Sequence, residues 1–137
     1  MSDKKRVVVG VDGSAGGDKA ARWAAEYAVR IGADLVLVTA WEWPSPYGGP
    51  ISWPGFSPDE DARTVVQKVR ANLAGGPHTI AAEVYEGRAG KVLVDLAQHA
   101  AVLVVGSRGH GAVAEALLGS VSAHCVRHAR CPVVVVR

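Results

Sequence analysis

The chain has 137 residues, of which 49% are hydrophobic and 20% charged, which is enough for one domain with a sizeable core. Its formal net charge of +2 is too small, and its Lys and Arg residues are too scattered, to indicate binding to nucleic acid or to an anionic membrane. The apolar runs fall far short of the roughly 20 residues of a membrane span, and the charged N-terminus has no signal-peptide core, so we expect a cytoplasmic protein.

The first half of the chain alternates between continuous apolar runs, which predict buried strands, and helical spacing. In chain order it predicts a strand at Arg6–Val11, a helix over Ala20–Ile31 that ends at Gly32, a strand at Asp34–Ala40 and a helix over Asp59–Leu73. Between the last two lies Trp41–Pro58, whose five prolines and five aromatic residues exclude regular structure.

The second half continues the alternation. It predicts a strand at Thr79–Tyr85, a helix over Gly90–Ala100, a strand at Ala101–Val105, a helix over Ser120–His128 and a strand at Pro132–Val136. Parallel neighbours need crossover connections, and continuous apolar strands indicate a sheet that is buried on both faces. We therefore expect a single α/β domain over residues 1–137, a three-layer sandwich with a five-stranded, mainly parallel sheet and helices on both faces.

Turns rich in glycine follow the first and fourth predicted strands, at the edge where ligands bind in such sheets. Asp12-Gly13-Ser14 follows the first strand, and Gly106-Ser-Arg-Gly-His-Gly111 follows the fourth, ahead of Gly119-Ser120-Val121-Ser122. Glycine permits positive φ angles and close backbone approach, and a helix that opens at Gly119 and Ser120 presents unpaired N–H groups to an anion. With Arg108 as a cation, this segment predicts a phosphate site; the alternative is an ordinary strand-to-loop turn.

Other chemistries have weaker support. Neither GxxxxGK[ST] nor GxGxxG occurs, so a P-loop and a Rossmann dinucleotide site are disfavoured. His124 and His128 have a spacing that can bind metal, but no third ligand is evident, and a helix C-terminus is an ordinary place for histidine. Cys125 and Cys131 match no zinc or CxxC pattern and are expected to be reduced thiols.

The spacing Gly106-x2-Gly109-x9-Gly119-Ser120 resembles the nucleotide motif G-2x-G-9x-G(S/T) of the universal stress protein family. The segments VVVGVDGS and AHCVRHARCPVVVVR also look like the first and last strands of that family, so the resemblance covers essentially the whole chain. It implies the strand order 3-2-1-4-5 and ATP bound between strands one and four.

Carried over by position, the resemblance gives each site residue a role. Gly106 and Gly109 would line ribose and phosphates, and Gly119, Ser120 and Ser122 would hold the phosphate tail, with Val121 between them as a further candidate site residue. Asp12 would accept from the ribose hydroxyls or assist a bound Mg²⁺, and backbone near Thr39-Ala40 would contact adenine. AMP and cyclic AMP fit the same backbone donors and are expected to be less favoured ligands than ATP. The family also implies a homodimer through the strand Pro132–Val136.

Three functions remain open from the sequence. The first is an ATP-binding stress-response or signalling module with at most slow ATP hydrolysis, because no base is paired with a nucleophile and no phosphate-loop lysine is present. The second is a phosphoryl or nucleotidyl transfer enzyme with Asp12 as metal ligand and Arg108 as charge stabiliser. The third is a protein-interaction dimer that works without nucleotide.

Overall fold

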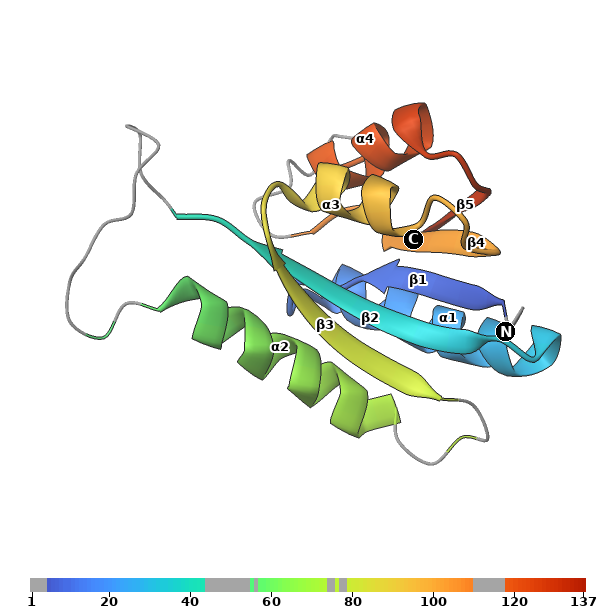
Figure 1. Cartoon of the computed structure of the whole chain (residues 1–137), viewed down its shortest axis with the longest axis horizontal. Coiled ribbons are helices and arrows are strands. Elements are labelled where there is room, and N and C mark those ends of the chain that lie inside the picture. The colour runs from blue at the N-terminus through green and yellow to red at the C-terminus, as the bar shows by residue number, and fades with distance from the viewer. Residues whose placement is uncertain (1–4, 44–54, 56, 74–75, 77–78, 110–117) are drawn as a thin grey trace.

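The computed structural model describes residues 5–43, 55, 57–73, 76, 79–109 and 118–137. Within these ranges, five parallel strands form one sheet in the order β3-β2-β1-β4-β5 (Figure 1). The strands are β1 (Arg6–Gly10), β2 (Asp34–Trp41), β3 (Ile80–Glu86), β4 (Val102–Gly106) and β5 (Val133–Val136). The expected strand order and the parallel sheet are confirmed, and β1 lies at the centre between β2 and β4.

Helices cover both faces of the sheet, which confirms the expected three layers. On one face lie α1 (Ala15–Ile31) and α2 (Pro58–Leu73), and on the other lie α3 (Ala89–Leu96) and α4 (Ser120–His128). Across the described ranges, none of these helices combines the length and apolar character that a membrane span requires.

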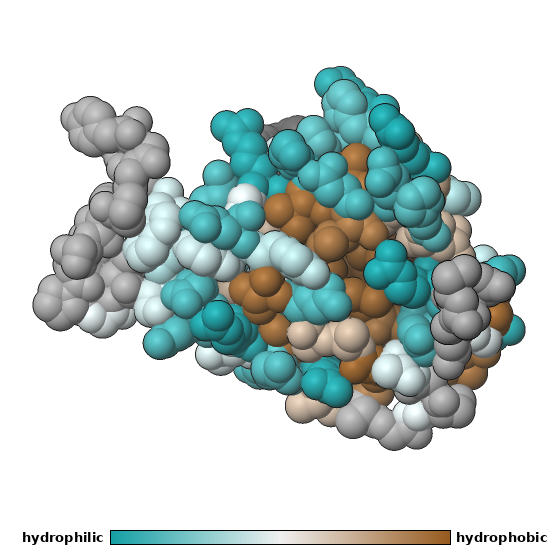
Figure 2. Space-filling view, viewed as in Figure 1, coloured by the Kyte–Doolittle hydropathy of each residue, from teal (hydrophilic) through white to brown (hydrophobic). Residues whose placement is uncertain are grey.

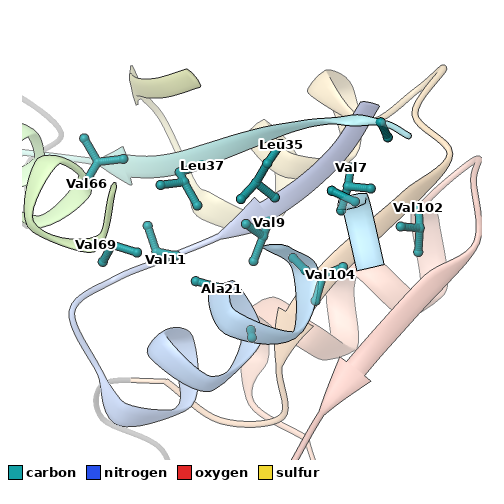
Figure 3. Close-up of a cluster of buried hydrophobic side chains, with 14 residues drawn as sticks. Val7, Val9, Val11, Ala21, Leu35, Leu37, Val66, Val69, Val102 and Val104 are labelled. Carbon is teal, nitrogen blue, oxygen red and sulfur yellow. The ribbon is translucent and has the colours of Figure 1, made fainter. Parts of the chain in front are cut away.

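The core consists of two clusters separated by the sheet. Alternate residues of β1 enter different clusters, because successive side chains of a strand point to opposite faces: Val7 and Val9 pack toward α1, and Val8 packs toward α3. This two-sided burial is why the strands are continuous runs of valine and leucine. Figure 3 shows the α1 side, where Val9, Leu35 and Leu37 lie near Ala21.

The sheet is less completely covered at its edges. All of β3 except its last residue is half-buried, as is the whole of β5. Figure 2, seen from the same direction as Figure 1, shows hydrophobic residues gathered in the middle of this face between hydrophilic surfaces. The central strand β1 is by contrast fully buried at Val7, Val8 and Val9.

Helix ends depend on local capping more than on apolar periodicity. Helix α1 begins at Ala15, before the periodic residues start at Ala20, because the Ser14 side chain accepts a hydrogen bond from the Gly17 N–H. The C-terminal cap predicted at Gly32 is confirmed, with φ of 67°.

Helix α3 ends at Leu96, four residues before the predicted end at Ala100. The apolar spacing runs past the end of the helix because Ala97 and Ala100, in the turn that follows, are also buried. Periodicity alone therefore predicts a helix that is too long. Most of the predicted aromatic loop Trp41–Pro58 lies outside the described residues. At its two ends, β2 includes Trp41 and α2 begins at Pro58, where a missing N–H has no cost in a helix.

The core assignment predicts that Leu37→Ala destabilises the fold by about 2–5 kcal/mol, because its fully buried side chain leaves a cavity between β2 and α1. Val29→Ala is the matched control: Val29 is 42% exposed on α1, and alanine favours helix, so its change should stay within about 0.5 kcal/mol. Urea denaturation followed by circular dichroism measures both. Equal unfolding midpoints for the two variants would contradict the assignment.

Candidate functional site

A cavity of about 370 Å³ opens at the carboxyl ends of the central strands, within the size range of small-molecule sites. The ends of β1, β2 and β4 line it, together with the first turns of α3 and α4. Strand β2 lies on one side of β1 and β4 lies on the other, so the direction in which strands are added to the sheet reverses between β1 and β4. Ligands of doubly wound sheets bind at such a point.

The inner wall of the cavity is apolar. Val38, Leu93 and Val105 line it, and each is at least nine-tenths buried as a residue. Leu93 lies directly over the end of β1, where a Cβ at Gly10 would be only 2.6 Å from Leu93 Cδ1. Glycine at position 10 therefore lets α3 close this wall, which suits a flat, weakly polar ring better than a charged group.

The loop between β1 and α1 presents one carboxylate to the cavity. Asp12 Oδ1 accepts hydrogen bonds from the Ser14 backbone N–H, at 2.9 Å, and from the Ser14 hydroxyl. The Ser14 Oγ in turn accepts from the Gly17 N–H at 3.1 Å, and Gly13 supplies the positive φ of 84° that the turn needs. The carboxylate is thus held in place by its own loop.

Gly106 and Gly109 are needed for packing between two loops. A Cβ at Gly106 would lie 2.8 Å from the Gly16 carbonyl oxygen, and one at Gly109 would lie 2.5 Å from Asp12 Oδ2. Neither glycine has a positive φ, so of the two properties of glycine considered above, these positions use close approach. Gly106 lets the loop after β4 lie against the backbone of the loop after β1, and Gly109 leaves room for the Asp12 carboxylate.

The start of α4 forms the outer wall. Gly119 is its N-cap without a side-chain hydrogen bond, and its own N–H donates to the Ser107 carbonyl at 2.6 Å. Ser120 and Val121 follow in the first turn, where a backbone N–H has no helical acceptor. These N–H groups, with the helix dipole behind them, favour an anion in the cavity.

Ser122 lines the cavity, but its hydroxyl serves the fold. Its Oγ donates to the Ser107 carbonyl at 3.0 Å and lies 3.1 Å from the Gly119 carbonyl, and the residue is 2% exposed. This side chain ties α4 to the loop after β4. A contribution of Ser122 to phosphate binding would therefore come from its backbone.

Nine of the ten predicted site residues line this one cavity: Asp12, Ala40, Gly106, Arg108, Gly109, Gly119, Ser120, Val121 and Ser122. Thr39 is not among the lining residues, since its side chain points to the opposite face, where its hydroxyl donates to the Val11 carbonyl at 3.0 Å. The expected contact was with the backbone near Thr39 and Ala40, and Ala40 does line the cavity. The predicted loop residues His110 and Gly111 lie outside the described residues. The sequence did not predict the apolar wall, because valines and leucines that line a pocket have the same sequence pattern as those that fill a core.

The described residues contain no group of three or more His, Cys, Asp and Glu side chains that could hold a metal. The rings of His124 and His128 lie 4.5 Å apart at their centroids, as their spacing on α4 predicts. Both cysteines are free, and burial raises the pKa of the Cys125 thiol to about 11, so that this thiol is protonated and unreactive at neutral pH.

Comparisons with known proteins extend this description. The universal stress protein family profile matches residues 4–137. The universal stress protein Rv2623 of Mycobacterium tuberculosis is 38% identical over 95% of the chain, and a universal stress protein of Mycolicibacterium smegmatis is 36% identical over the same share. The chain spans about half the length of these relatives, 46% and 47% respectively.

Solved structures share the fold. A universal stress protein in complex with cAMP has a TM-score of 0.72 and 29% identity, covering 99% of this chain and 98% of that one. The universal stress protein of Archaeoglobus fulgidus in complex with dAMP has a TM-score of 0.75, with 99% and 100% of the two chains covered. At 21% identity, this second likeness supports the fold alone.

The packing of the glycines predicts different outcomes at two positions. Gly106→Ala should lower the free energy of unfolding by about 1–3 kcal/mol, because its Cβ meets rigid backbone at Gly16. Gly119→Ala should lower it by less, at most about 1 kcal/mol, because the nearest atoms to a Cβ there lie at 3.5 Å and the loss comes only from alanine being a poorer N-cap than glycine. Chemical denaturation of the two variants tests this, and an equal loss in both would refute the packing role of Gly106.

Proposed function

Because the chain belongs to the universal stress protein family, we propose that it binds an adenine nucleotide, with ATP as the expected ligand, in the cavity at the ends of β1, β2 and β4. The observation that carries the proposal is that one cavity is lined by the motif residues Gly106, Gly109, Gly119 and Ser120 together with Asp12 from the loop after β1. The cAMP complex of a relative with 29% identity supports an adenine ligand.

The residues present fit such a ligand. The apolar wall of Val38, Leu93 and Val105, near Ala40 at the end of β2, would hold the base. The Asp12 carboxylate, beside Gly106, would accept a hydrogen bond from a ribose hydroxyl. The first N–H groups of α4 and Gly109 would bind the phosphates, and Arg108 would provide a positive charge.

Magnesium would enter with the nucleotide. Asp12 supplies the one carboxylate among the described residues that line the cavity, and its Oδ1 is already engaged by Ser14. Because Mg²⁺ is commonly held by one or two carboxylates together with substrate phosphates, this environment suits a nucleotide-borne ion better than a permanent protein-held one.

The role we propose is a stress-response or signalling module whose nucleotide biases its conformation or its partners, with at most slow ATP hydrolysis. The cavity brings together backbone donors, one carboxylate and Arg108. Binding and positioning need these groups, whereas phosphoryl transfer also needs an activated nucleophile. Multiple turnover of ATP that is abolished by Asp12→Ala would favour the enzyme instead.

Calorimetric titration with ATP, ADP, AMP and cyclic AMP tests the site. Gly119→Val should weaken ATP binding at least about tenfold, because the added isopropyl group occupies the space beside the α4 N-terminus. Val29→Ala, on the exposed face of α1, is the control and should keep the wild-type affinity. Absence of binding for all four nucleotides, or unchanged ATP binding in Gly119→Val, would reject the site.

We also propose that the chain forms a homodimer through β5, which lies at an edge of the sheet. The Pro132 carbonyl accepts a hydrogen bond from the Leu103 N–H of β4 at 2.9 Å, and the Val136 carbonyl accepts one from the Ser107 N–H just after β4 at 2.8 Å. Because a strand alternates the direction of its backbone groups, those of Val133 and Val135 point to the open edge. A β-branched edge with exposed backbone groups is a template for pairing with a second strand.

Light scattering coupled to size exclusion should give about twice the chain mass of 14.3 kDa at micromolar concentration. Val135→Pro should shift the protein toward the monomer, because it removes an outward-facing N–H and leaves in place the hydrogen bonds that Pro132 and Val136 accept from Leu103 and Ser107. A monomeric wild-type protein, or a folded Val135→Pro variant that remains dimeric, would contradict pairing through β5.

A further inference from the structure

A second cavity, of about 490 Å³, adjoins the first. The two share Ala89, Ser120 and Val121 in their linings, so they meet at the first turns of α3 and α4. The remaining lining of the second cavity is polar apart from one glycine: Glu42, Arg88, Gly90, Lys91 and His124. We call it the basic cavity, because two cations, Arg88 and Lys91, face one carboxylate, Glu42.

The two cations are available to a ligand. Arg88 is exposed and makes no ion pair with any residue in the described ranges. Lys91 Nζ lies 3.0 Å from Asp95 Oδ2, with the two side chains 74% and 63% exposed. A pair this exposed contributes little, so Lys91 can turn to a stronger anion at small cost.

Close packing of α3 and α4 places this cavity beside the nucleotide site. A Cβ at Gly90 would lie 2.8 Å from the His124 ring, so glycine is what allows the first turn of α3 to lie against α4. As a result, Arg88 and Lys91 of the α3 start adjoin Ser120 of the α4 start, which also lines the first cavity. An anionic chain that passes Ser120 therefore enters a region of net positive charge.

We propose that the basic cavity is the subsite for the terminal phosphates of the bound nucleotide, with Arg88 as the main residue that favours triphosphate over monophosphate. The inference rests on the nucleotide binding proposed above. The glycine motif does not determine how many phosphates the ligand carries, because glycine turns hold a phosphate through backbone N–H groups alone. A guanidinium distinguishes ligands by the number of negative charges placed beside it. Glu42 lines the same cavity, and its negative charge repels the terminal phosphates, which limits the preference for triphosphate over monophosphate.

Affinities for ATP and AMP are measured by calorimetry on the full chain at one fixed salt concentration. Arg88→Gln should weaken ATP binding about tenfold and AMP binding less than about twofold, because only ATP places charge in the basic cavity. Glu42→Gln should strengthen ATP binding about twofold with no change for AMP, an effect that a structural role of either residue would not produce. Arg22→Gln removes the same charge from an exposed position on α1 and should change neither affinity.

The outcomes separate this inference from the one that supports it. If wild-type protein binds ATP and AMP equally, or if Arg88→Gln weakens both to the same extent, the subsite is refuted while nucleotide binding stands. The subsite is also refuted if Arg22→Gln and Arg88→Gln lose the same amount of ATP affinity, because the loss would then come from the net charge of the protein. If no adenine nucleotide binds at all, both proposals fail together. Thermal melts within a few degrees of wild type verify that the exposed substitutions leave the fold intact.

Discussion

The contact between the loop after β1 and the loop after β4 is the constraint on which the site depends. A Cβ at Gly16 would collide with the Arg108 carbonyl oxygen, and a Cβ at Gly106 would collide with Gly16 in return. Gly109 lies over the Asp12 carboxylate in the same way. Because these glycines have no side chains, two loops from distant parts of the chain can come into close contact. The mouth of the cavity lies between these two loops and the start of α4.

This contact is possible because the sheet beneath it is rigid. The central strands β1, β2 and β4 are buried on both faces, with Val8, Leu37 and Leu103 among the fully buried side chains. Packed interiors resist small displacements, so the carboxyl ends of these strands hold their loops at a definite separation. The loops at this edge are therefore positioned by a hydrophobic core, part of which (Val38, Leu93 and Val105) also forms the inner wall of the cavity.

The two cavities differ in chemistry. The first has an apolar wall and backbone donors, which suit a base and a phosphate, whereas the second is lined by the exposed charged side chains of Glu42, Arg88 and Lys91. Arg88 and Lys91 lie outside the glycine motif. In the function proposed here, the motif would therefore hold the nucleotide and these side chains would set the preference for its charge.

Residues close together in the chain were sufficient to predict the alternation of strands and helices and the burial of both sheet faces, and they contain the glycine spacing. The helix start at Ala15 and the end of α3 at Leu96 needed capping geometry, which apolar periodicity does not encode. Contacts between distant segments of the folded chain were needed to learn that the Thr39 side chain points away from the cavity, that the Ser122 hydroxyl donates to the Ser107 carbonyl, and that Gly106 and Gly109 are needed for packing. The partners in these contacts are 15 to 97 positions apart in the chain, from Ser122 and Ser107 to Gly109 and Asp12. The residue pattern of one segment does not determine which distant segment will pack against it.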